Sequence, residues 1–408
     1  MLQEAPKRVI PFSPPDITEA EIAEVSEALR SGWITTGPRT KELECRLKDY
    51  LGADGCCCLS SQTACAEMAL RLLGVGPGDE VIVPAYTYTA SASVVCHVGA
   101  TPVLVDSQPD SLEMDYGQVE AAVNERTKAI VPVDLGGVPC DYDRIFGIVE
   151  SKRGLFRPAS ELQRALGRAA VCTDAAHALG ATRRGRPVGS IADFSSFSFH
   201  AVKNLTTAEG GCLTWRAIPG VDSGELYHRL QLLSLHGQSK DALAKTRLGA
   251  WEYDVVGTWY KCNMTDVAAA MGLVQLGRYP GMLERRREII EHYDGALAPL
   301  GVVPLPHYTE GHSSSGHLYI ARVPGLGEEG RNALVEAMAK RGVACNVHYK
   351  PLPMMTAYRG LGYDVVDFPN AYALYADEVT LPLHTRLSDE DVEYVVESFR
   401  DSLAEVRG

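Results

Sequence analysis

The sequence predicts an α/β protein with a mostly parallel sheet that helices cover on both faces, followed by a smaller α+β unit. Between residues 57 and 199, short apolar runs alternate with amphipathic stretches of helical period. Strands that alternate with helices at this spacing are typical of parallel sheets whose strands are buried on both faces. After about residue 217 the pattern becomes helical, and a second alternation begins near residue 302.

Local signals place the elements of the first part. A cap-like Asp16 precedes the helical spacing of Ile22, Val25 and Leu29, and turn residues fill the loop 31–38. We expect helices over 16–29, 40–51, 62–73, 90–98, 115–123 and 141–150, and strands over 57–60, 80–84, 101–106, 128–135, 169–174, 194–199 and 212–215. Residues 153–168 interrupt one helix-to-strand connection. This insertion could shape substrate access or decorate the surface, and decoration is the favoured interpretation.

The second part is predicted from the same periodicities. We expect helices over 225–236, 265–276, 280–297, 330–341 and 388–403, and strands over 318–323 and 344–347. A chain of 408 residues is too long for one compact core, so we place a domain boundary between residues 281 and 300. The expected domains are 1–285 and 286–408, and the N-terminal segment could pack on the second one.

Composition limits the class of protein. Lys and Arg number 39 against 52 Asp and Glu, and the net charge of −13 argues against general binding to nucleic acid or anionic membranes. No apolar run has the length of a bilayer-spanning helix, and the N-terminal stretch lacks the apolar core of a secretory leader. The eleven cysteines have no disulfide-framework spacing, which favours a reducing cytoplasm. Cys56, Cys57 and Cys58 are interpreted as small buried strand residues, with a metal site as the minor alternative.

One lysine follows an apolar, aromatic-rich strand and is the first candidate for chemistry. Lys203 lies just past the expected strand 194–199, and Glu209 and two glycines then lead into strand 212–215. Burial lowers the pKa of a lysine and supplies the neutral amine that Schiff-base chemistry requires. Taken alone, a surface lysine at the start of a loop is slightly the better interpretation.

Three further groups lie where parallel strands end, which is where such sheets bind ligands. Residues 60–64 join a strand to a helix whose free N–H groups could bind phosphate, although an ordinary N-cap by Ser60 or Ser61 is the better interpretation when they are taken alone. Asp174 ends a strand and could hold a cationic ring nitrogen or cap the next helix. Tyr88 could stack on a planar ring or pack half-buried. Together with Lys203 and Ser198, these groups are the set that pyridoxal 5′-phosphate (PLP) requires.

The chain resembles the DegT/DnrJ/StrS family of fold-type-I, PLP-dependent sugar aminotransferases over nearly its whole length. The resemblance rests on seven segments, which are 31–38 (SGWITTGP), 78–84 (GDEVIVP), 99–106 (GATPVLVD), 127–132 (TKAIVP), 174–180 (DAAHALG), 198–204 (SFHAVKN) and 209–211 (EGG). The segment 198–204 is most similar to members that act on nucleotide-linked 4-keto sugars.

This resemblance implies roles for individual residues. Lys203 would carry PLP as a Schiff base and shuttle the proton, and Asp174 would pair with the pyridine nitrogen. Tyr88 would stack on the ring, and His177, in place of the family's usual glutamine, would lie near the ring's 3′-oxygen. The phosphate would be bound by Ser198, by the backbone of Gln62 and Thr63, and by Asn263 of the neighbouring subunit. A homodimer with a shared active site is therefore implied, and Gln62, where a small residue is usual, puts the nearby geometry in doubt.

The resulting hypothesis is a cytoplasmic ping-pong aminotransferase that moves an amino group, with glutamate as the expected donor, to a nucleotide-linked 4-keto sugar. Alternatives are a keto-cyclitol or 3-keto-sugar aminotransferase, a pyridoxamine-dependent sugar dehydratase and a non-catalytic PLP-binding regulator. The dehydratase branch has histidine at the lysine position, and a regulator would lack Lys203 or Asp174. His236, His348, Tyr349 and Lys350 lie in segments that approach the substrate in relatives, but each is individually more easily explained as structural.

Overall fold

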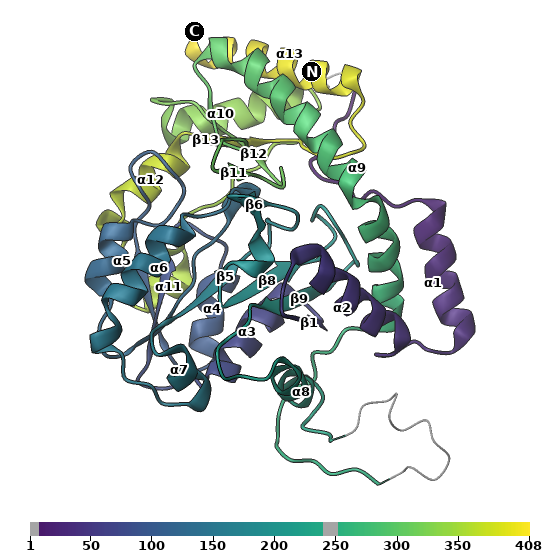
Figure 1. The fold of residues 1–408 in the computed structure, drawn as a ribbon. Coiled ribbons are helices and arrows are strands. Elements are labelled where there is room, and N and C mark those ends of the chain that lie inside the picture. The colour runs from purple at the N-terminus through teal and green to yellow at the C-terminus, as the bar shows by residue number, and fades with distance from the viewer. Residues whose placement is uncertain (1–7, 240–251) are drawn as a thin grey trace.

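A seven-stranded sheet in the order β1–β9–β8–β5–β4–β2–β3 forms the centre of the molecule (Figure 1). The structure is a computed structural model, and it describes residues 8–239 and 252–408. Four of the six strand pairings are parallel, and the two antiparallel ones both involve β9. The predicted mostly parallel sheet is therefore confirmed. Its strands are β1 (Gly55–Leu59), β2 (Glu80–Pro84), β3 (Thr101–Val105), β4 (Thr127–Ile130), β5 (Ala170–Asp174), β8 (Phe194–Ser198) and β9 (Gly211–Trp215).

Strand direction determines where the candidate residues meet. Since β9 is antiparallel to both β1 and β8, those two strands run in the same direction as β5, β4, β2 and β3. The carboxyl ends of β1, β2, β5 and β8 consequently lie at one edge of the sheet, where β9 begins. This edge receives the loops that carry Gln62, Tyr88, Asp174 and Lys203.

Helices cover both faces of the sheet because its strand side chains alternate between two apolar cores. Cys57 packs in one core with α3 (Gln62–Leu73), α4 (Ala90–His97) and α8 (Ser223–Ser234). Cys56 and Cys58 point to the opposite face. That face is covered by α2 (Pro38–Leu51), α5 (Tyr116–Ala122) and α6 (Tyr142–Ser151). All three cysteines are buried on β1, as expected from the sequence.

The insertion at 153–168 lies away from the edge where the carboxyl ends meet. It contains α7 (Glu161–Leu166), and Ser160 Oγ donates to the carbonyl of Leu73 at 2.7 Å. Leu73 is the last residue of α3, which begins at Gln62 on the carboxyl-end edge, so the insertion lies near the other end of that helix. This position keeps the insertion away from the cavity edge, and its Leu162 and Leu166 are buried in the core beside α3.

A single helix, α9 (Asp266–Leu297), replaces the two helices predicted over 265–276 and 280–297. Pro280 lies inside it and removes one backbone donor. The neighbouring side chains Tyr279 and Met282 are buried, and this packing outweighs the local break. The proposed boundary at residue 285 therefore falls within a continuous helix. The first turns of α9 pack against the sheet and α1 (Glu19–Ser31), and the last turns enter a second core.

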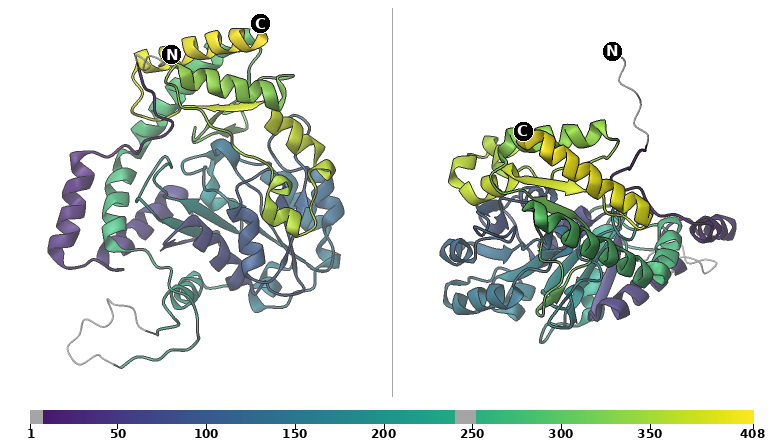
Figure 2. Two further views of the ribbon diagram at one scale, coloured as in Figure 1. Left: turned by 180° about the vertical axis from the view of Figure 1, so that it is seen from behind. Right: turned by 90° about the horizontal axis from the view of Figure 1, so that it is seen from above.

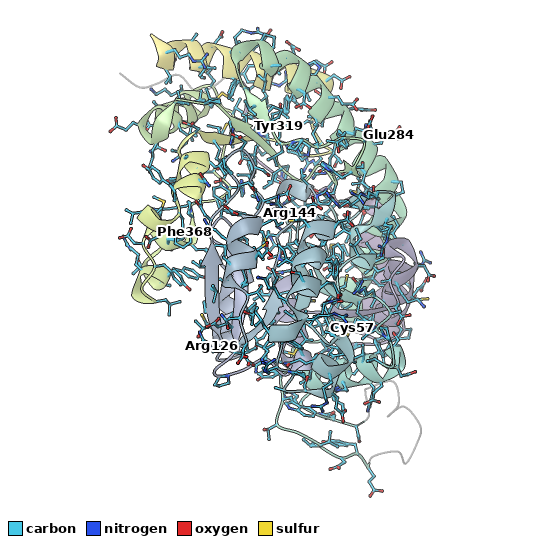
Figure 3. The ribbon with its side chains drawn as sticks, turned by 60° about the vertical axis from the view of Figure 1, so that its left-hand side comes forward. Cys57, Arg126, Arg144, Glu284, Tyr319 and Phe368 are labelled. Atoms are coloured by element: carbon cyan, nitrogen blue, oxygen red, sulfur yellow. The ribbon has the colours of Figure 1, made fainter. Side chains whose placement is uncertain are left out.

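The second core belongs to a small antiparallel sheet of β10 (Val303–Pro304), β12 (Tyr319–Arg322) and β13 (Glu378–Leu381). Figure 2 shows α10 (Gly327–Lys340) and α13 (Asp389–Arg407) over this sheet, and Figure 3 labels Tyr319 in this core and Cys57 in the central sheet. The N-terminal Ile10 is also buried there. Other short elements are β6 (Thr182–Arg183), β7 (Arg186–Pro187), β11 (His312–Ser313), α11 (Thr356–Gly360) and α12 (Pro369–Ala376).

The predicted strand at 344–347 is wrong. Only isolated bridges occur near it in the described part of the chain, between Val343 and Ile10 and between Asn346 and Thr380. The partner strand β13 had no prediction, because its apolar residues are few and a helix directly precedes it. The segment after Asn346 leaves β13 and runs to the carboxyl-end edge of the large sheet.

Candidate active site

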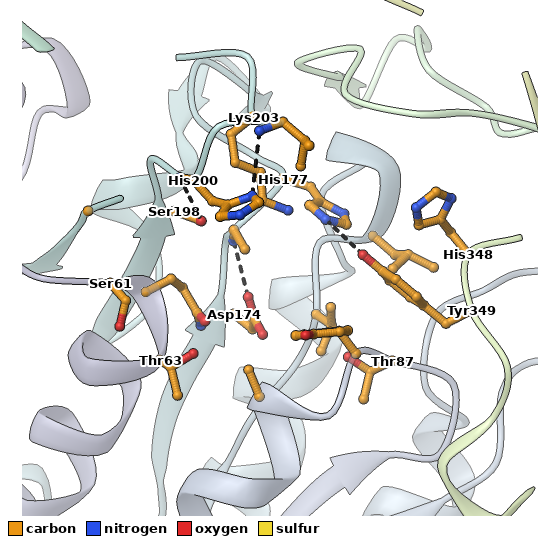
Figure 4. A pocket seen from close by; sticks show the side chains of 18 of the residues that line it. Ser61, Thr63, Thr87, Asp174, His177, Ser198, His200, Lys203, His348 and Tyr349 are labelled. Carbon is orange, nitrogen blue, oxygen red and sulfur yellow. Dashed lines mark hydrogen bonds between the residues drawn. The ribbon is translucent and has the colours of Figure 1, made fainter. Parts of the chain in front are cut away.

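A cavity of about 490 Å³ lies at the carboxyl ends of the large sheet's strands (Figure 4). Seven of the eight residues predicted for the site line it. They are Gln62, Thr63, Tyr88, Asp174, His177, Ser198 and Lys203. The eighth, Asn263, lies outside the cavity wall. Its side-chain amide donates to Thr36 Oγ1 at 2.5 Å, and its backbone bridges to Leu59.

Lys203 is held at the cavity by the turn that follows β8. Its backbone N–H donates to the carbonyl of His200 at 2.9 Å, and the residue is half-buried. Burial lowers the pKa of Lys203 to about 8, and the nearby carboxylate of Asp174 partly opposes this shift. An amine with such a pKa is neutral in a minority of molecules near neutral pH that is far larger than for an ordinary lysine, so it can act as a nucleophile or a base.

Asp174 is the buried last residue of β5. Its Oδ2 accepts a hydrogen bond from Ser91 Oγ at 2.7 Å, and its Oδ1 accepts from the backbone N–H of Ala176 at 3.1 Å. Thr87 Oγ1 lies 2.8 Å from Ser91 Oγ and continues this network. Burial raises the pKa of Asp174, while the two donors and the charge of Lys203 lower it. A cation that approached this carboxylate would further favour its ionised form.

The start of α3 presents backbone donors to the cavity. Ser61 is the N-cap, and its hydroxyl accepts from Ala64 N at 3.1 Å. Within the described residues, the N–H groups of Gln62 and Thr63 donate to no other backbone group, so an anion could bind them. Gly211 allows the close approach of β9, since a Cβ there would lie 2.6 Å from the nitrogen of Gln62.

The unusual Gln62 leaves this geometry intact. Its side chain is buried, and Nε2 donates to Ser196 Oγ at 3.0 Å on β8. The amide therefore bonds to the sheet, and the backbone of the helix start remains available. On the same side of the cavity, Ser198 Oγ accepts from the N–H of His200 at 3.3 Å, and Nε2 of His200 lies 3.6 Å from Glu209 Oε1.

His177 is buried between two walls of the cavity. The backbone N–H of Gly136 donates to Nδ1 at 3.2 Å, and Nε2 lies 3.3 Å from the hydroxyl of Tyr349. Burial and the charge of Lys203 lower the pKa of His177 well below its usual value. The ring is therefore neutral near pH 7. Because Nδ1 accepts a hydrogen bond, Nε2 carries the hydrogen.

The tyrosines lie at the open side of the cavity. Tyr88 is 57% exposed, and its ring centroid lies 5.6 Å from that of Tyr349. Both His348 and Tyr349 line the cavity, but His236 and Lys350 do not. The sequence placed His348 and Tyr349 in segments that approach the substrate in relatives but favoured a structural interpretation of each, and it gave no signal for Ser91 and Thr87. A hydroxyl near the start of an apolar helix carries no local signal of contact with a distant carboxylate.

These groups fit PLP. The cavity combines an amine of lowered pKa at Lys203, a buried carboxylate at Asp174 and the backbone donors at the start of α3. A Cβ at Gly211 would close the approach to those donors. Across the described residues, no group of three or more His, Cys, Asp or Glu side chains could hold a metal ion.

Comparison with known proteins decides the family. The model of the DegT/DnrJ/EryC1/StrS aminotransferase family matches residues 15–400. The chain belongs to this family. It is a PLP-dependent aminotransferase of fold type I, and its cofactor is PLP. None of the described helices is long and apolar enough to span a membrane.

Individual relatives agree with this assignment. Spr1654 of Streptococcus pneumoniae, a candidate sugar aminotransferase solved in its PMP form, is 59% identical with a TM-score of 0.95, over 97% of this chain and 100% of that one. The spore coat polysaccharide biosynthesis protein SpsC of Bacillus subtilis is 38% identical over 397 residues, which are 96% of each chain. PseC of Helicobacter pylori, an aminotransferase involved in pseudoaminic acid biosynthesis, is 26% identical with a TM-score of 0.85, over 98% of this chain and 100% of that one.

Proposed function

We propose that this aminotransferase moves an amino group from glutamate to a nucleotide-linked 4-keto sugar by a ping-pong mechanism. The observation that carries the proposal is the amine of Lys203, with its pKa lowered to about 8, in one cavity with the buried carboxylate of Asp174. The names of SpsC and PseC, both tied to the biosynthesis of sugar-containing products, support a sugar as the acceptor.

The residues of the cavity would hold the cofactor by complementary contacts. The backbone of Gln62 and Thr63 and the hydroxyl of Ser198 would bind its phosphate. Asp174 would pair with the ring nitrogen, and Tyr88 would cover the ring. His177 would lie beside the ring's 3′-oxygen and, being neutral, would add no charge there.

When bound, PLP supplies a carbonyl that condenses with amines and a ring that withdraws electrons from the adjacent carbon. Nζ of Lys203 would remove the proton from Cα of the amino donor in the first half-reaction. In the second, it would deliver a proton to the sugar carbon that receives the amino group. A group with a pKa near 8 suits both directions, because it gains and loses a proton near neutral pH.

We also propose an arrangement for the whole enzyme. It is a cytoplasmic homodimer in which Asn263 reaches the phosphate site of the neighbouring subunit, and its two domains cover residues 1–285 and 286–408. Support for the shared site comes from Asn263 lying outside its own cavity, and support for the cytoplasm comes from eleven free cysteines. When Lys203→Ala and Asn263→Ala subunits are mixed, some dimers contain one subunit of each kind. If the site is shared, one of the two sites in such a dimer has both Lys203 and Asn263 intact, so partial activity should return. Two inactive variants that stay inactive after mixing would contradict sharing.

Absorbance of the cofactor tests the proposed reaction. Adding glutamate to the PLP form should remove the long-wavelength band, and adding the correct keto sugar should restore it. The second step should be screened with 3-keto and 4-keto nucleotide sugars and with keto-cyclitols. A band that no amino donor moves would refute transamination, and a band that only a keto-cyclitol restores would replace the proposed acceptor.

A further inference from the structure

The cavity wall opposite the start of α3 is formed by His348 and Tyr349, and Figure 4 shows the two walls on either side of Asp174. The phosphate-binding donors lie on one side, so the other side faces the part of the cavity that a substrate enters. What His348 presents to that space depends on which ring nitrogen carries its hydrogen.

The carboxyl of Glu378 and the hydroxyl of Thr380 contact His348 on its side away from the cavity. The backbone N–H of His348 donates to Glu378 Oε1 at 2.5 Å. Thr380 Oγ1 lies 3.2 Å from Glu378 Oε2 and 3.0 Å from His348 Nδ1. Both Glu378 and Thr380 belong to β13 and are completely buried. Phe12 stacks on the imidazole with a centroid distance of 5.5 Å, which fixes the plane of the ring.

The other ring nitrogen borders open space. In the part of the chain that the structure describes, Nε2 of His348 has no hydrogen-bond partner. It is also not among the fully buried polar atoms without a partner, so it borders space that solvent can reach. Since His348 lines the cavity, that open space is the cavity.

Glu378 is in a setting that favours a neutral carboxyl. It forms no ion pair within the described ranges, and the buried Arg331 of α10 pairs instead with Glu328 at 3.8 Å and donates to the carbonyl of Tyr375. An unpaired charge in such a place is costly, so the proton stays on the carboxyl. Burial accordingly raises the pKa of Glu378 to about 8.

Thr380 has one hydroxyl hydrogen, so it can donate to only one of its two contacts, Glu378 Oε2 and His348 Nδ1. With Glu378 protonated, Oε2 donates to Thr380 Oγ1, and Thr380 donates to Nδ1 of His348. Nδ1 is then an acceptor, and the hydrogen of the neutral ring lies on Nε2. An ionised Glu378 would reverse the direction and leave a lone pair on Nε2.

We propose that Glu378 and Thr380 are positioning residues that fix His348 with its hydrogen on Nε2, and that His348 donates this hydrogen to an oxygen of the keto sugar. The keto sugar is the larger substrate and has more oxygen atoms than glutamate. A donor on the wall away from the phosphate site can therefore bind one of those oxygens. The inference rests on the proposed function for the identity of the substrate, but the state of the imidazole does not depend on it.

The first experiment reads the imidazole directly. Holoenzyme with ¹⁵N-labelled histidine should show His348 with a protonated Nε2 and an unprotonated Nδ1 in a long-range ¹H–¹⁵N correlation near pH 7, and His348→Gln identifies the signal. Glu378→Gln keeps a donor and an acceptor in the same places and should keep this pattern. Thr380→Val removes the relay and should change it, whereas Thr380→Ser should not. A wild-type signal with the hydrogen on Nδ1 would overturn the proposal.

The second experiment separates the two substrates. Thr380→Val should raise KM for the keto sugar about tenfold, with the glutamate half-reaction within about twofold of wild type. Equal losses in both half-reactions with an unchanged imidazole signal would show a merely structural role and overturn the proposal. A protein with the expected imidazole signal that aminates none of the sugars would overturn the substrate assignment alone.

Discussion

The pKa of Lys203 is the quantity on which the proposed chemistry depends most. The structure lowers it from the usual 10.5 to about 8. At pH 7.5, a group with pKa 8 is neutral in about a quarter of molecules, whereas one with pKa 10.5 is neutral in roughly one of a thousand. Burial thus raises the fraction of reactive amine by a factor of more than about two hundred. Below pH 8 the amine becomes protonated, so reactivity should fall as the pH falls through this value.

Competitive acetylation measures this pKa without any substrate. The apoenzyme, prepared by removing the cofactor with hydroxylamine, is treated with trace acetic anhydride from pH 6 to pH 11, and peptides are quantified by mass spectrometry. Lys203 should reach half-maximal labelling near pH 8, and the exposed Lys340 on α10 serves as the comparison within the same sample.

Replacing Asp174 with Asn gives the matched perturbation. The carboxylate raises the pKa of Lys203, so its removal should move the midpoint further below 8. The introduced asparagine can turn its amide oxygen toward the N–H of Ala176 and donate from its NH2 group to Ser91 Oγ, which keeps both contacts. If Lys203 instead reached half-maximal labelling near the ordinary lysine value of 10.5 in the wild type, or if Asp174→Asn raised its midpoint, the electrostatic reasoning would be refuted.

Three further substitutions test other parts of the site. Lys203→Ala should still bind PLP but lose turnover by a factor of about 10³ or more, since it removes the proton carrier, and substantial activity in the absence of added amines would contradict its role. Asp174→Ala should cost about 10²–10³ in kcat through loss of the partner for the ring nitrogen, and normal turnover would show that the inferred orientation is wrong. Gly211→Ala puts a Cβ 2.6 Å from the nitrogen of Gln62 and should weaken PLP binding about tenfold by equilibrium titration. Unchanged affinity would mean that the helix start does not bind the phosphate.

The sequence predicted the large sheet well because its signals are local. Continuous apolar strands such as β2 and clean amphipathic helices such as α3 carry their period within a dozen residues. The carboxyl-end rule then brought Lys203 and Asp174 to one edge. Pro280 misled the prediction, since a local break cannot reveal that Tyr279 and Met282 are anchored by distant packing. β13 was missed because its four residues carry few apolar side chains and α12 directly precedes it.

The contacts behind the site were beyond sequence reasoning. Ser91 and Asp174 are 83 residues apart, and Glu378 and His348 are separated by 30. Neither pair has a spacing that marks a motif. Their functions depend on burial and on the direction of a few hydrogen bonds, which the sequence does not encode locally.

Borohydride reduction followed by peptide mapping tests the central claim most directly. Reduction of the PLP form should fix the cofactor to one lysine as a stable secondary amine, and mass spectrometry should find the added phosphopyridoxyl group on Lys203. The label should be absent after prior conversion with glutamate, because that step frees the lysine. A label on any other lysine, or a reduced enzyme that carries none, would contradict the assignment of this cavity as the active site.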